Sequence, residues 1–431
     1  MMRAMEPSAV VAWSAAAGPT PSPFWRAGGA LDVGPAGLTL GGVALAPLAR
    51  GHGTPLYVYD AATIRRRVAA LREALATVGV PYAIHYALKA NRFPPVLACL
   101  RAEGVAIDVC SPREVAWALA QGWQADQISA TAGMLSGRDL AAFAAADVHV
   151  NLDARSALRR WAATLAAAGK SASPAAAVGL RINPEVTVGW GEEPKLAYGH
   201  SKFGFDGADV LAAAAYAASL GLTVNELHIH PGWGLQAAQA ATLGGAMERL
   251  VALANAIPSV TTLNVGGGLC WPQRPDDSPL ALATWADLIR AALAHSERPL
   301  RLKCEPGTYI MAASGVLVAE VTTVEPRRLA TWVGLDIGHN TNVFAAHYGI
   351  PMAIVPVADP LAEPTVRYHV AGNINEANDI FAKDRLLPPL AEGDLVALFP
   401  AGAYGTSMAS DHCMRGFAGE LLVDTSDRAA S

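Results

Sequence analysis

The stretch PYAIHYALKAN, residues 81–91, is an apolar run that ends in a lysine and an asparagine. Seven of its first eight residues are apolar or aromatic, which is typical of a strand buried on both faces. Lys89 would then stand at the tip of that strand. A lysine in this position is most often a solvated strand end, so its meaning depends on what the other strands carry.

Seven more apolar runs follow up to residue 308, separated by helical patterns rich in Ala and Leu. The runs are VAIDVC, QISATA, VHVNLD, AVGLRINP, ELHIHPG, LNVGGG and RLKCEPG. Apolar strands that alternate with helices predict a parallel sheet covered by helices. Eight such units predict an α/β fold, a closed (β/α)8 barrel of the triosephosphate isomerase type. An open doubly wound sheet is the weaker alternative, because no run is recognisable as an edge strand.

The pattern changes after residue 308. Runs such as GVLVAEVTTVEP, TVRYHVAG and DLVALFPAG have no helical stretches between them and predict a β-rich domain. ALDVGPAGLTLGGVAL, near the start of the chain, looks similar. We therefore expect residues 1–55 to contribute to a β domain with residues 311–431, and residues 56–310 to form the barrel between them.

Composition limits the possible partners and surroundings. The formal net charge of −5 gives no electrostatic reason to expect nucleic acid or an anionic membrane surface as a partner. No segment reaches the ~18 uninterrupted apolar residues of a membrane span, and the opening residues lack the apolar core of a signal peptide, so we expect a cytoplasmic protein. The five cysteines show no CxxC spacing, and their odd number argues against a disulfide framework and a zinc site.

Catalytic residues of such barrels lie at the C-terminal ends of the strands. These ends carry Lys89, Asp108, Asn151, Arg181, His228, His230, Gly266, Gly267, Gly268 and Glu305. The glycines follow the seventh strand, where barrels bind phosphate, because glycine lets backbone N–H groups approach phosphate oxygens. A lysine, a phosphate cradle and a carboxylate in one cavity suit pyridoxal 5′-phosphate, which needs a Schiff-base lysine and an acid partner for its ring nitrogen.

Six motifs extend this interpretation: YALKAN, RINPEV, HSKFGF, NVGGGL, CEPG and GAYGTSM, in that order. With them the sequence resembles the fold-type III pyridoxal-phosphate decarboxylases, which include diaminopimelate, ornithine and arginine decarboxylases. The resemblance runs from TPLYVYD near residue 54 to GELLVD near residue 424. It implies a barrel of the alanine racemase type, an amino-acid substrate, and a head-to-tail homodimer with two shared active sites.

The resemblance also implies roles for individual residues. Lys89 would bind the cofactor covalently beside Asp108, His230 would stack on its ring, and Arg181 would lie near the ring hydroxyl. Gly266, Gly267 and Gly268 would hold the phosphate, with help from Tyr404. Glu305 would keep the ring nitrogen protonated, and the resulting electron sink favours decarboxylation over racemisation.

The sequence departs from the family at the substrate end of the site. Trp233 stands where a serine usually helps to hold the phosphate, and Thr308 and Phe344 stand where diaminopimelate decarboxylases have arginines. An unpaired buried carboxylate is costly, so we predict that diaminopimelate is not the substrate. The residues expected to contact the substrate are Thr308, Phe344, Tyr348, Asn375, Glu376 and Tyr404.

The segment GNINEAND, residues 372–379, differs in another way. The family places a cysteine there that protonates Cα, whereas this chain has Asn375, whose amide cannot act as a general acid near neutral pH. The proton must come from Lys89, from a water, or from His412 or Cys413, which are more plausible as ordinary loop residues. Glu376 would face a distal amine or hydroxyl of the substrate and is the residue we expect to cross between subunits.

Three hypotheses follow. The first is a decarboxylase for an unusual or conjugated amino acid, such as those of siderophore or other secondary-metabolite pathways. The second is a catalytically silent, cofactor-binding regulatory relative. The third is a metal-dependent hydrolase that uses His228, His230 and Asp108. We rank the third last, because it leaves Lys89 and the glycine run unexplained.

Overall fold

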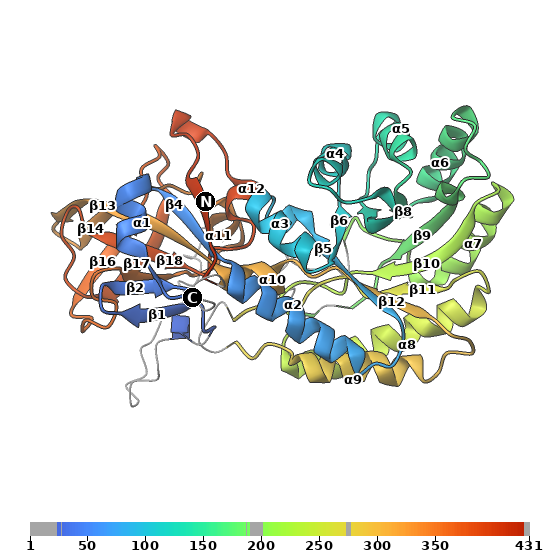
Figure 1. The fold of residues 1–431 in the computed structure, drawn as a ribbon, viewed down its shortest axis with the longest axis horizontal. Helices are drawn as coiled ribbons and strands as arrows, with labels where there is room; N and C mark the ends of the chain where they lie inside the picture. Colours follow the sequence, from blue (N-terminus) through green and yellow to red (C-terminus); the bar gives the residue numbers. More distant parts are fainter. Residues whose placement is uncertain (1–23, 27, 187, 190–200, 273–276, 426–431) are drawn as a thin grey trace, which may run out of the picture.

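The structure is a computed structural model that describes residues 24–425 except 27, 187, 190–200 and 273–276. Two lobes lie end to end along its long axis: a barrel surrounded by helices and a β-rich lobe (Figure 1). None of the helices in the described ranges is both long and apolar enough to cross a membrane.

The barrel confirms the fold predicted from the apolar runs. Its eight strands are all parallel and close in the order β10-β11-β12-β5-β6-β7-β8-β9. They are β5 (Tyr82–Ala87), β6 (Ala106–Val109), β7 (Ile128–Thr131), β8 (His149–Leu152), β9 (Ala177–Ile182), β10 (Thr223–Ile229), β11 (Thr262–Asn264) and β12 (Arg301–Cys304). The C-terminal ends of all eight strands therefore meet at one mouth.

Helices cover the outside of the barrel, as Figure 1 shows. They are α2 (Ala61–Ala76), α3 (Pro94–Ala102), α4 (Pro112–Ala120), α5 (Gly137–Ala146), α6 (Arg155–Ala167), α7 (Val210–Ser219), α8 (Ala240–Ala256) and α9 (Leu282–Leu293). Trp161 of α6 and Trp285 of α9 are fully buried against the strands. Side-chain caps fix several helix starts, such as Asp60, which accepts hydrogen bonds from the backbone N–H groups of Ala62 and Thr63.

The β-rich lobe contains an eight-stranded sheet with the path β15-β18-β13-β14-β16-β17, and β4 lies between β13 and β19. Its strands are β4 (Leu56–Asp60), β13 (Gly315–Pro326), β14 (Thr331–Leu335), β15 (Ala353–Pro356), β16 (Val366–Ala371), β17 (Ile380–Leu387), β18 (Leu395–Phe399) and β19 (Gly419–Val423). A three-stranded sheet of β1 (Leu31–Gly34), β2 (Gly37–Leu40) and β3 (Val43–Ala44), followed by α1 (Leu45–His52), accompanies it. The N–H of Leu38 donates to the carbonyl of Val357 (2.7 Å), which ties this small sheet to the lobe.

The chain passes between the lobes at a point that differs from the predicted boundary. Leu56–Asp60, which the boundary at residue 56 assigns to the barrel, is β4 and pairs with β13 and β19 of the β-rich lobe. The barrel therefore begins with α2. The N-terminal segment of the β-rich lobe is five residues longer than predicted and ends at Asp60, because an apolar run such as LYVYD is compatible with a strand in either lobe.

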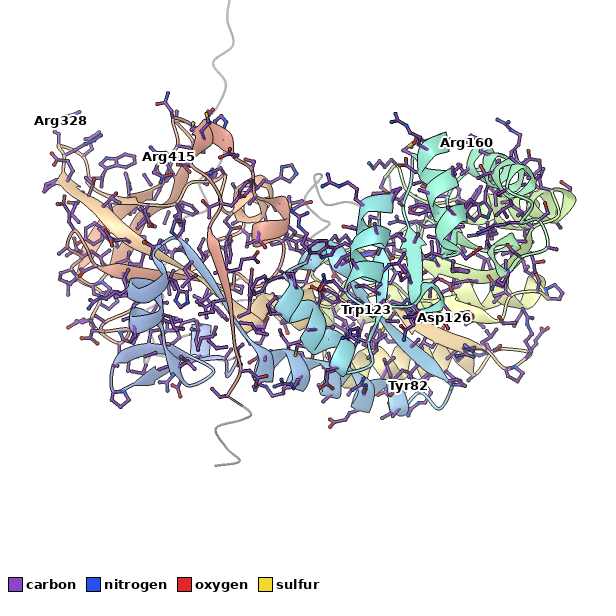
Figure 2. The ribbon with its side chains drawn as sticks, turned by 45° about the horizontal axis from the view of Figure 1, so that its top comes forward. Tyr82, Trp123, Asp126, Arg160, Arg328 and Arg415 are labelled. Carbon is purple, nitrogen blue, oxygen red and sulfur yellow. The ribbon has the colours of Figure 1, made fainter. Side chains whose placement is uncertain are left out.

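Short helices lie near the junction of the lobes: α10 (Thr308–Met311), α11 (Val343–Tyr348) and α12 (Gly405–Met408). Tyr57 of β4 donates a hydrogen bond to the carbonyl of Thr341 (2.9 Å). Figure 2 shows side chains filling both lobes, with Tyr82 and Trp123 on the barrel and Arg328 and Arg415 on the β-rich lobe. The barrel mouth thus opens toward loops supplied by the second lobe.

Candidate active site

Lys89 follows β5 on a single helical turn, Leu88–Ala90. Its Nζ lies 3.3 Å from Oδ2 of Asp108 and 3.6 Å from Sγ of Cys110. Two residues of the β-rich lobe hold this turn. The N–H of Tyr404 donates to the carbonyl of Ala90 (2.6 Å), and Oγ of Ser407 donates to the carbonyl of Lys89 (2.7 Å). The reactive amine is therefore positioned by both lobes.

The proton balance around Lys89 depends on buried charges. Burial disfavours the charged amine, but Cys110 and Asp108 nearby raise the pKa of Lys89 well above its usual range. Asp108 has no exposed surface, and burial together with the charge of Glu305 raises its pKa to about 8. The raised pKa makes Asp108 a stronger base than an ordinary carboxylate. It lies beside Nζ, so it is placed to take the proton of Lys89 when that amine must become neutral in order to react.

Glu305, just after β12, sits in a hydrogen-bonded pocket inside the mouth. Its Oε2 lies 3.0 Å from Nε2 of His228, and its Oε1 accepts from Nδ2 of Asn264 (2.7 Å) and from Oγ1 of Thr131 (3.2 Å). Burial opposes the charge, but His228 and these hydrogen bonds hold the pKa of Glu305 well below its usual range. Glu305 is an ionised carboxylate at neutral pH, suited to hold a proton on a ring nitrogen.

The glycine run lines a narrow cradle beside Glu305. Gly266 has φ +66°, and a Cβ there would clash with the carbonyl oxygen of Ile229. A Cβ on Gly267 would lie 2.6 Å from the carbonyl oxygen of Glu305. The N–H of Gly266 donates to Oδ1 of Asn264 (3.0 Å), so the same amide side chain fixes both the cradle and the acid.

His230 and Arg181 complete the described part of the mouth. Burial, followed by the charges of Arg181 and Lys89, lowers the pKa of His230 to about 3, so its ring is neutral and suited to stacking on a cofactor. Arg181 is buried and lies over the ring of Phe203, 4.1 Å from its centroid. Together with Lys89, the glycine cradle and the ionised Glu305, these residues fit pyridoxal phosphate.

An aromatic cluster forms one wall of the site, where the sequence predicted substrate contacts. Phe344 packs against Trp233, Tyr348 and Tyr404, with ring centroids 5.2, 5.3 and 4.9 Å away. All four side chains are half-buried. The hydroxyl of Tyr404 lies 3.4 Å from where a Cβ on Gly307 would stand, which places the cluster beside the strand end that carries Glu305. Thr308, the next residue, is buried at the start of α10.

The structure does not bring every predicted residue to this mouth. Asn375 and Glu376 are exposed on the β16–β17 loop, and none of the described contacts joins them to Lys89. Oε1 of Glu376 instead lies 3.3 Å from Nε2 of His412, which is itself exposed. Asp379 anchors the loop by accepting hydrogen bonds from the backbone N–H groups of His339 (2.7 Å) and Ile374 (3.0 Å).

His228, a predicted ligand of the metal hypothesis, contacts Glu305 as described above. Within the described ranges, no group of three or more His, Cys, Asp or Glu side chains is placed to hold a metal ion.

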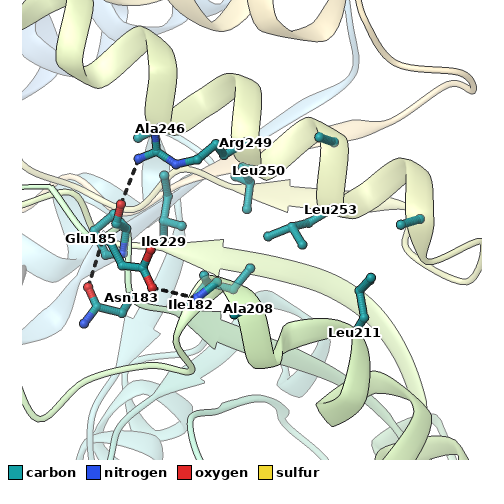
Figure 3. A pocket seen from close by; sticks show the side chains of 14 residues that line it. Ile182, Asn183, Glu185, Ala208, Leu211, Ile229, Ala246, Arg249, Leu250 and Leu253 are labelled. Atoms are coloured by element: carbon teal, nitrogen blue, oxygen red, sulfur yellow. Dashed lines mark hydrogen bonds between the residues drawn. The ribbon is translucent and has the colours of Figure 1, made fainter.

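A separate groove lies outside the mouth, between α7 and α8 (Figure 3). Its volume is about 440 Å³, and apolar side chains such as Ile182, Leu250 and Leu253 line it. The charged groups at one end already bind backbone: Arg249 donates to the carbonyl of Pro184 (3.0 Å), and Glu185 accepts from the N–H of Gly207 (2.9 Å). We therefore place the chemistry at the barrel mouth and not in this groove.

Sequence reasoning missed three side chains of the site: Cys110, Thr131 and Asn264. Cys110 ends the apolar run VAIDVC two residues after Asp108, Thr131 lies in the run QISATA, and Asn264 opens the NVGGG motif. Residues two apart on a strand point to the same side, and that rule could have drawn attention to Cys110.

Comparisons with known proteins agree with this geometry. A family model described as pyridoxal-dependent decarboxylase, pyridoxal binding domain, matches residues 61–312. The chain is 32% identical over 396 residues to a diaminopimelate decarboxylase of Methanothermobacter thermautotrophicus, covering 90% of each chain. It is 34% identical over 392 residues to one of Pseudomonas aeruginosa, covering 89% of this chain and 91% of that protein. The crystal structure of diaminopimelate decarboxylase from Helicobacter pylori complexed with L-lysine superposes with a TM-score of 0.78 at 26% identity, covering 88% of this chain and 93% of that one.

Proposed function

This chain belongs to the pyridoxal-dependent decarboxylases, and on that premise we propose that it removes the α-carboxylate of an amino acid whose side chain ends in an uncharged or aromatic group. It is a carboxy-lyase that uses pyridoxal phosphate. The substrate, the roles of individual residues, the assignment of residues 61–310 to the cofactor-binding domain and the assembly are parts of the proposal.

Bound pyridoxal phosphate supplies the electron sink for the pair left when the bond between Cα and the carboxylate breaks. Lys89 would hold it through Nζ, and Asp108, 3.3 Å away, would take or return the proton of that amine. Gly266, Gly267 and Gly268 would hold the phosphate. Glu305 would keep the proton on the ring nitrogen, because its negative charge is fixed by three hydrogen-bond donors.

His230 would lie against the ring in its neutral form, and Arg181 would be near the ring hydroxyl. Neither His230 nor Arg181 needs to gain or lose a proton in these roles. Lys89, Glu305 and the glycine cradle are all present, which favours an active enzyme over the silent relative. Buried polar groups are costly to keep, so a chain that had lost its activity would have no reason to retain them.

The aromatic cluster is the observation that carries the substrate proposal. A carboxylate placed against Trp233, Phe344 and Tyr404 would lose hydration, and these three side chains carry no positive charge to replace it, at a cost of several kcal/mol. An apolar or aromatic side chain would instead add contact area at ~25 cal/mol per Å² buried. The first hypothesis also places such a substrate in siderophore or other secondary metabolism.

Diaminopimelate is the second candidate substrate, because both relatives described above carry the name diaminopimelate decarboxylase. This conflicts with the expectation drawn from Thr308 and Phe344. The two candidates differ at one point only: whether the distal end of the substrate bears a charge.

We also propose a head-to-tail homodimer in which the β16–β17 loop enters the site of the partner. Asn375 and Glu376 support this, since both are exposed in the single chain while Asp379 anchors the loop behind them. Glu376 would then face the distal group of a substrate bound to the partner.

The test is release of carbon dioxide by the purified, cofactor-loaded protein. The panel contains meso-diaminopimelate, L-lysine, L-ornithine, L-arginine, L-phenylalanine, L-tyrosine and L-leucine. We expect one of the last three to exceed diaminopimelate in kcat/KM by tenfold or more. If meso-diaminopimelate is the best substrate, the proposed specificity is wrong and the second candidate holds. If none releases carbon dioxide while the protein binds cofactor, the silent relative is favoured.

A further inference from the structure

Cys110 occupies a place in the site that the proposed mechanism does not use. It follows β6, two residues after Asp108, so both side chains point toward Lys89. Its Sγ lies 3.6 Å from Nζ of Lys89, and the residue is half-buried. Its backbone N–H donates to Oε2 of Glu114 (2.6 Å), and Ser111 caps α4 immediately afterwards. The backbone that carries the thiol is thus held in place at the mouth.

The other cysteines do not share this position. Cys99 lies in α3, Cys270 and Cys304 are buried, and Cys413 is exposed on a loop of the β-rich lobe. Cys110 is also accompanied by Asp108, a fully buried carboxylate that binds the same Nζ. The feature is therefore a pair of ionisable side chains, Cys110 and Asp108, beside one reacting atom, Nζ of Lys89.

Decarboxylation replaces a carbon–carbon bond by a carbon–hydrogen bond, so an acid must reach the carbon that loses its carboxylate. Asn375 carries no ionisable proton, and the oxygens of Glu305 are occupied by hydrogen-bond donors. The amino group of the substrate takes the place of Nζ, and its Cα lies one bond from that place. A donor within 3.6 Å of Nζ is within reach of this carbon.

We propose that Cys110 is a catalytic residue, the acid that delivers the proton to Cα. This inference rests on the proposed decarboxylation. The S–H bond breaks, and its proton joins the electron pair left on Cα when carbon dioxide departs. The thiolate pairs with the ammonium of Lys89, which lies in contact with it, and regains its proton from that ammonium. Lys89 is then a neutral amine again, and solvent supplies the single proton that the net reaction consumes.

The electrostatics around the thiol support a stored proton. Burial raises the pKa of Cys110 to about 12, Lys89 opposes this, and Asp108, Glu114 and Glu305 add to it. The thiol therefore stays protonated at neutral pH. It becomes a stronger acid when Lys89 is released as an ammonium, which is the stage at which a proton is needed.

The first experiment uses the cofactor-free protein and does not depend on activity. Iodoacetamide alkylation from pH 6 to 10, resolved by peptide mass spectrometry, gives the rate at each cysteine. We expect Cys110 to react slowly at pH 8, and at least about threefold more slowly still in Lys89→Met, because the cation that favours the thiolate is gone. Cys413 is the exposed reference thiol, and its rate should not change. Equal pH profiles for Cys110 in the wild type and in Lys89→Met would show that Lys89 does not influence the thiol, and the proposed proton transfer between the two side chains would be wrong.

The second experiment measures products of the loaded enzyme with whichever substrate releases carbon dioxide. Wild-type protein should form one amine per carbon dioxide. In Cys110→Ser and Cys110→Ala, amine formation should slow by ~10²-fold or more. The electron pair would then take its proton at an atom other than Cα. Hydrolysis by water would release a carbonyl compound and leave the nitrogen of the substrate on the cofactor. Cys99→Ala, a buried cysteine in an outer helix, is the control substitution.

The outcomes separate this inference from the proposed function. If both Cys110 variants keep one amine per carbon dioxide at rates within about twofold of the wild type, another group is the acid and the inference is wrong. If wild-type protein releases no carbon dioxide from any substrate, the proposed function fails. The alkylation result would then still report whether Lys89 and Cys110 share a proton.

Discussion

Replacing Phe344 by arginine would place a cation inside the aromatic cluster of the active site. An arginine there could bind the distal carboxylate of diaminopimelate in a charge-assisted pair worth ~1.5–3 kcal/mol. Since each 1.4 kcal/mol is about tenfold in rate, the kcat/KM for diaminopimelate should rise by roughly 10- to 150-fold. The substitution removes three aromatic contacts, to Trp233, Tyr348 and Tyr404. At ~0.5–1.5 kcal/mol each, their loss should lower stability by ~1.5–4.5 kcal/mol.

The assay compares kcat/KM for meso-diaminopimelate and for the best uncharged substrate, and a urea titration measures stability. Phe344→Met is the matched control, because it removes the same ring contacts without adding a charge. We expect both variants to lose stability to a similar extent, and the arginine variant alone to gain activity toward diaminopimelate. The reasoning is refuted if the two variants shift the ratio of kcat/KM values equally, or if the arginine lowers an activity toward diaminopimelate that the wild type already has.

The remaining predictions concern the cofactor, the fold and the assembly. Purified protein should absorb near about 420 nm, and borohydride should label Lys89; Lys89→Ala should lose the covalent form, and a label on another lysine would contradict the assignment. Gly266→Ala should weaken cofactor binding by about tenfold or more in a titration, because its Cβ meets the carbonyl of Ile229. Gly349→Ala, with a similar φ of +64° but open space around it, should leave binding unchanged. Burial lowers the pKa of His85 to about 4 from 6.5, so the folded chain binds fewer protons than the unfolded chain between these values. Stability present above pH 6.5 should therefore be lost as the pH falls through this window, and urea titrations should show a shallower loss in His85→Gln. Mixing inactive Lys89→Ala and Glu376→Ala chains should restore part of the activity if sites are shared; no recovery after proven subunit exchange would mean that each site is built within one chain.

The barrel could be predicted from the sequence because its signals are local. A strand buried on both faces shows itself as a short apolar run, and eight of these alternate with helical patterns. The residue that follows each run must lie at the mouth, since parallel strands all end on the same side. Lys89, Asp108, His230 and Glu305 could be assigned to one cavity on this ground alone.

The membership of β4 could not be predicted in the same way. LYVYD is apolar enough for either lobe, and its pairing with β13 and β19 joins segments more than 250 residues away in sequence. Packing against distant segments decides which sheet a strand joins, and the residues within the strand do not indicate that choice.

The sequence by itself therefore determined the fold class, the cofactor and the set of residues at the strand ends, because strand period and strand direction fix where those side chains point. Only the tertiary structure decided which of them touch. The contact of Cys110 with Lys89, the sharing of Asn264 between Glu305 and the glycine cradle, and the cluster around Phe344 all join separate segments. Their distances follow from how the barrel closes and how the second lobe packs on it, and a one-dimensional pattern has no information about either.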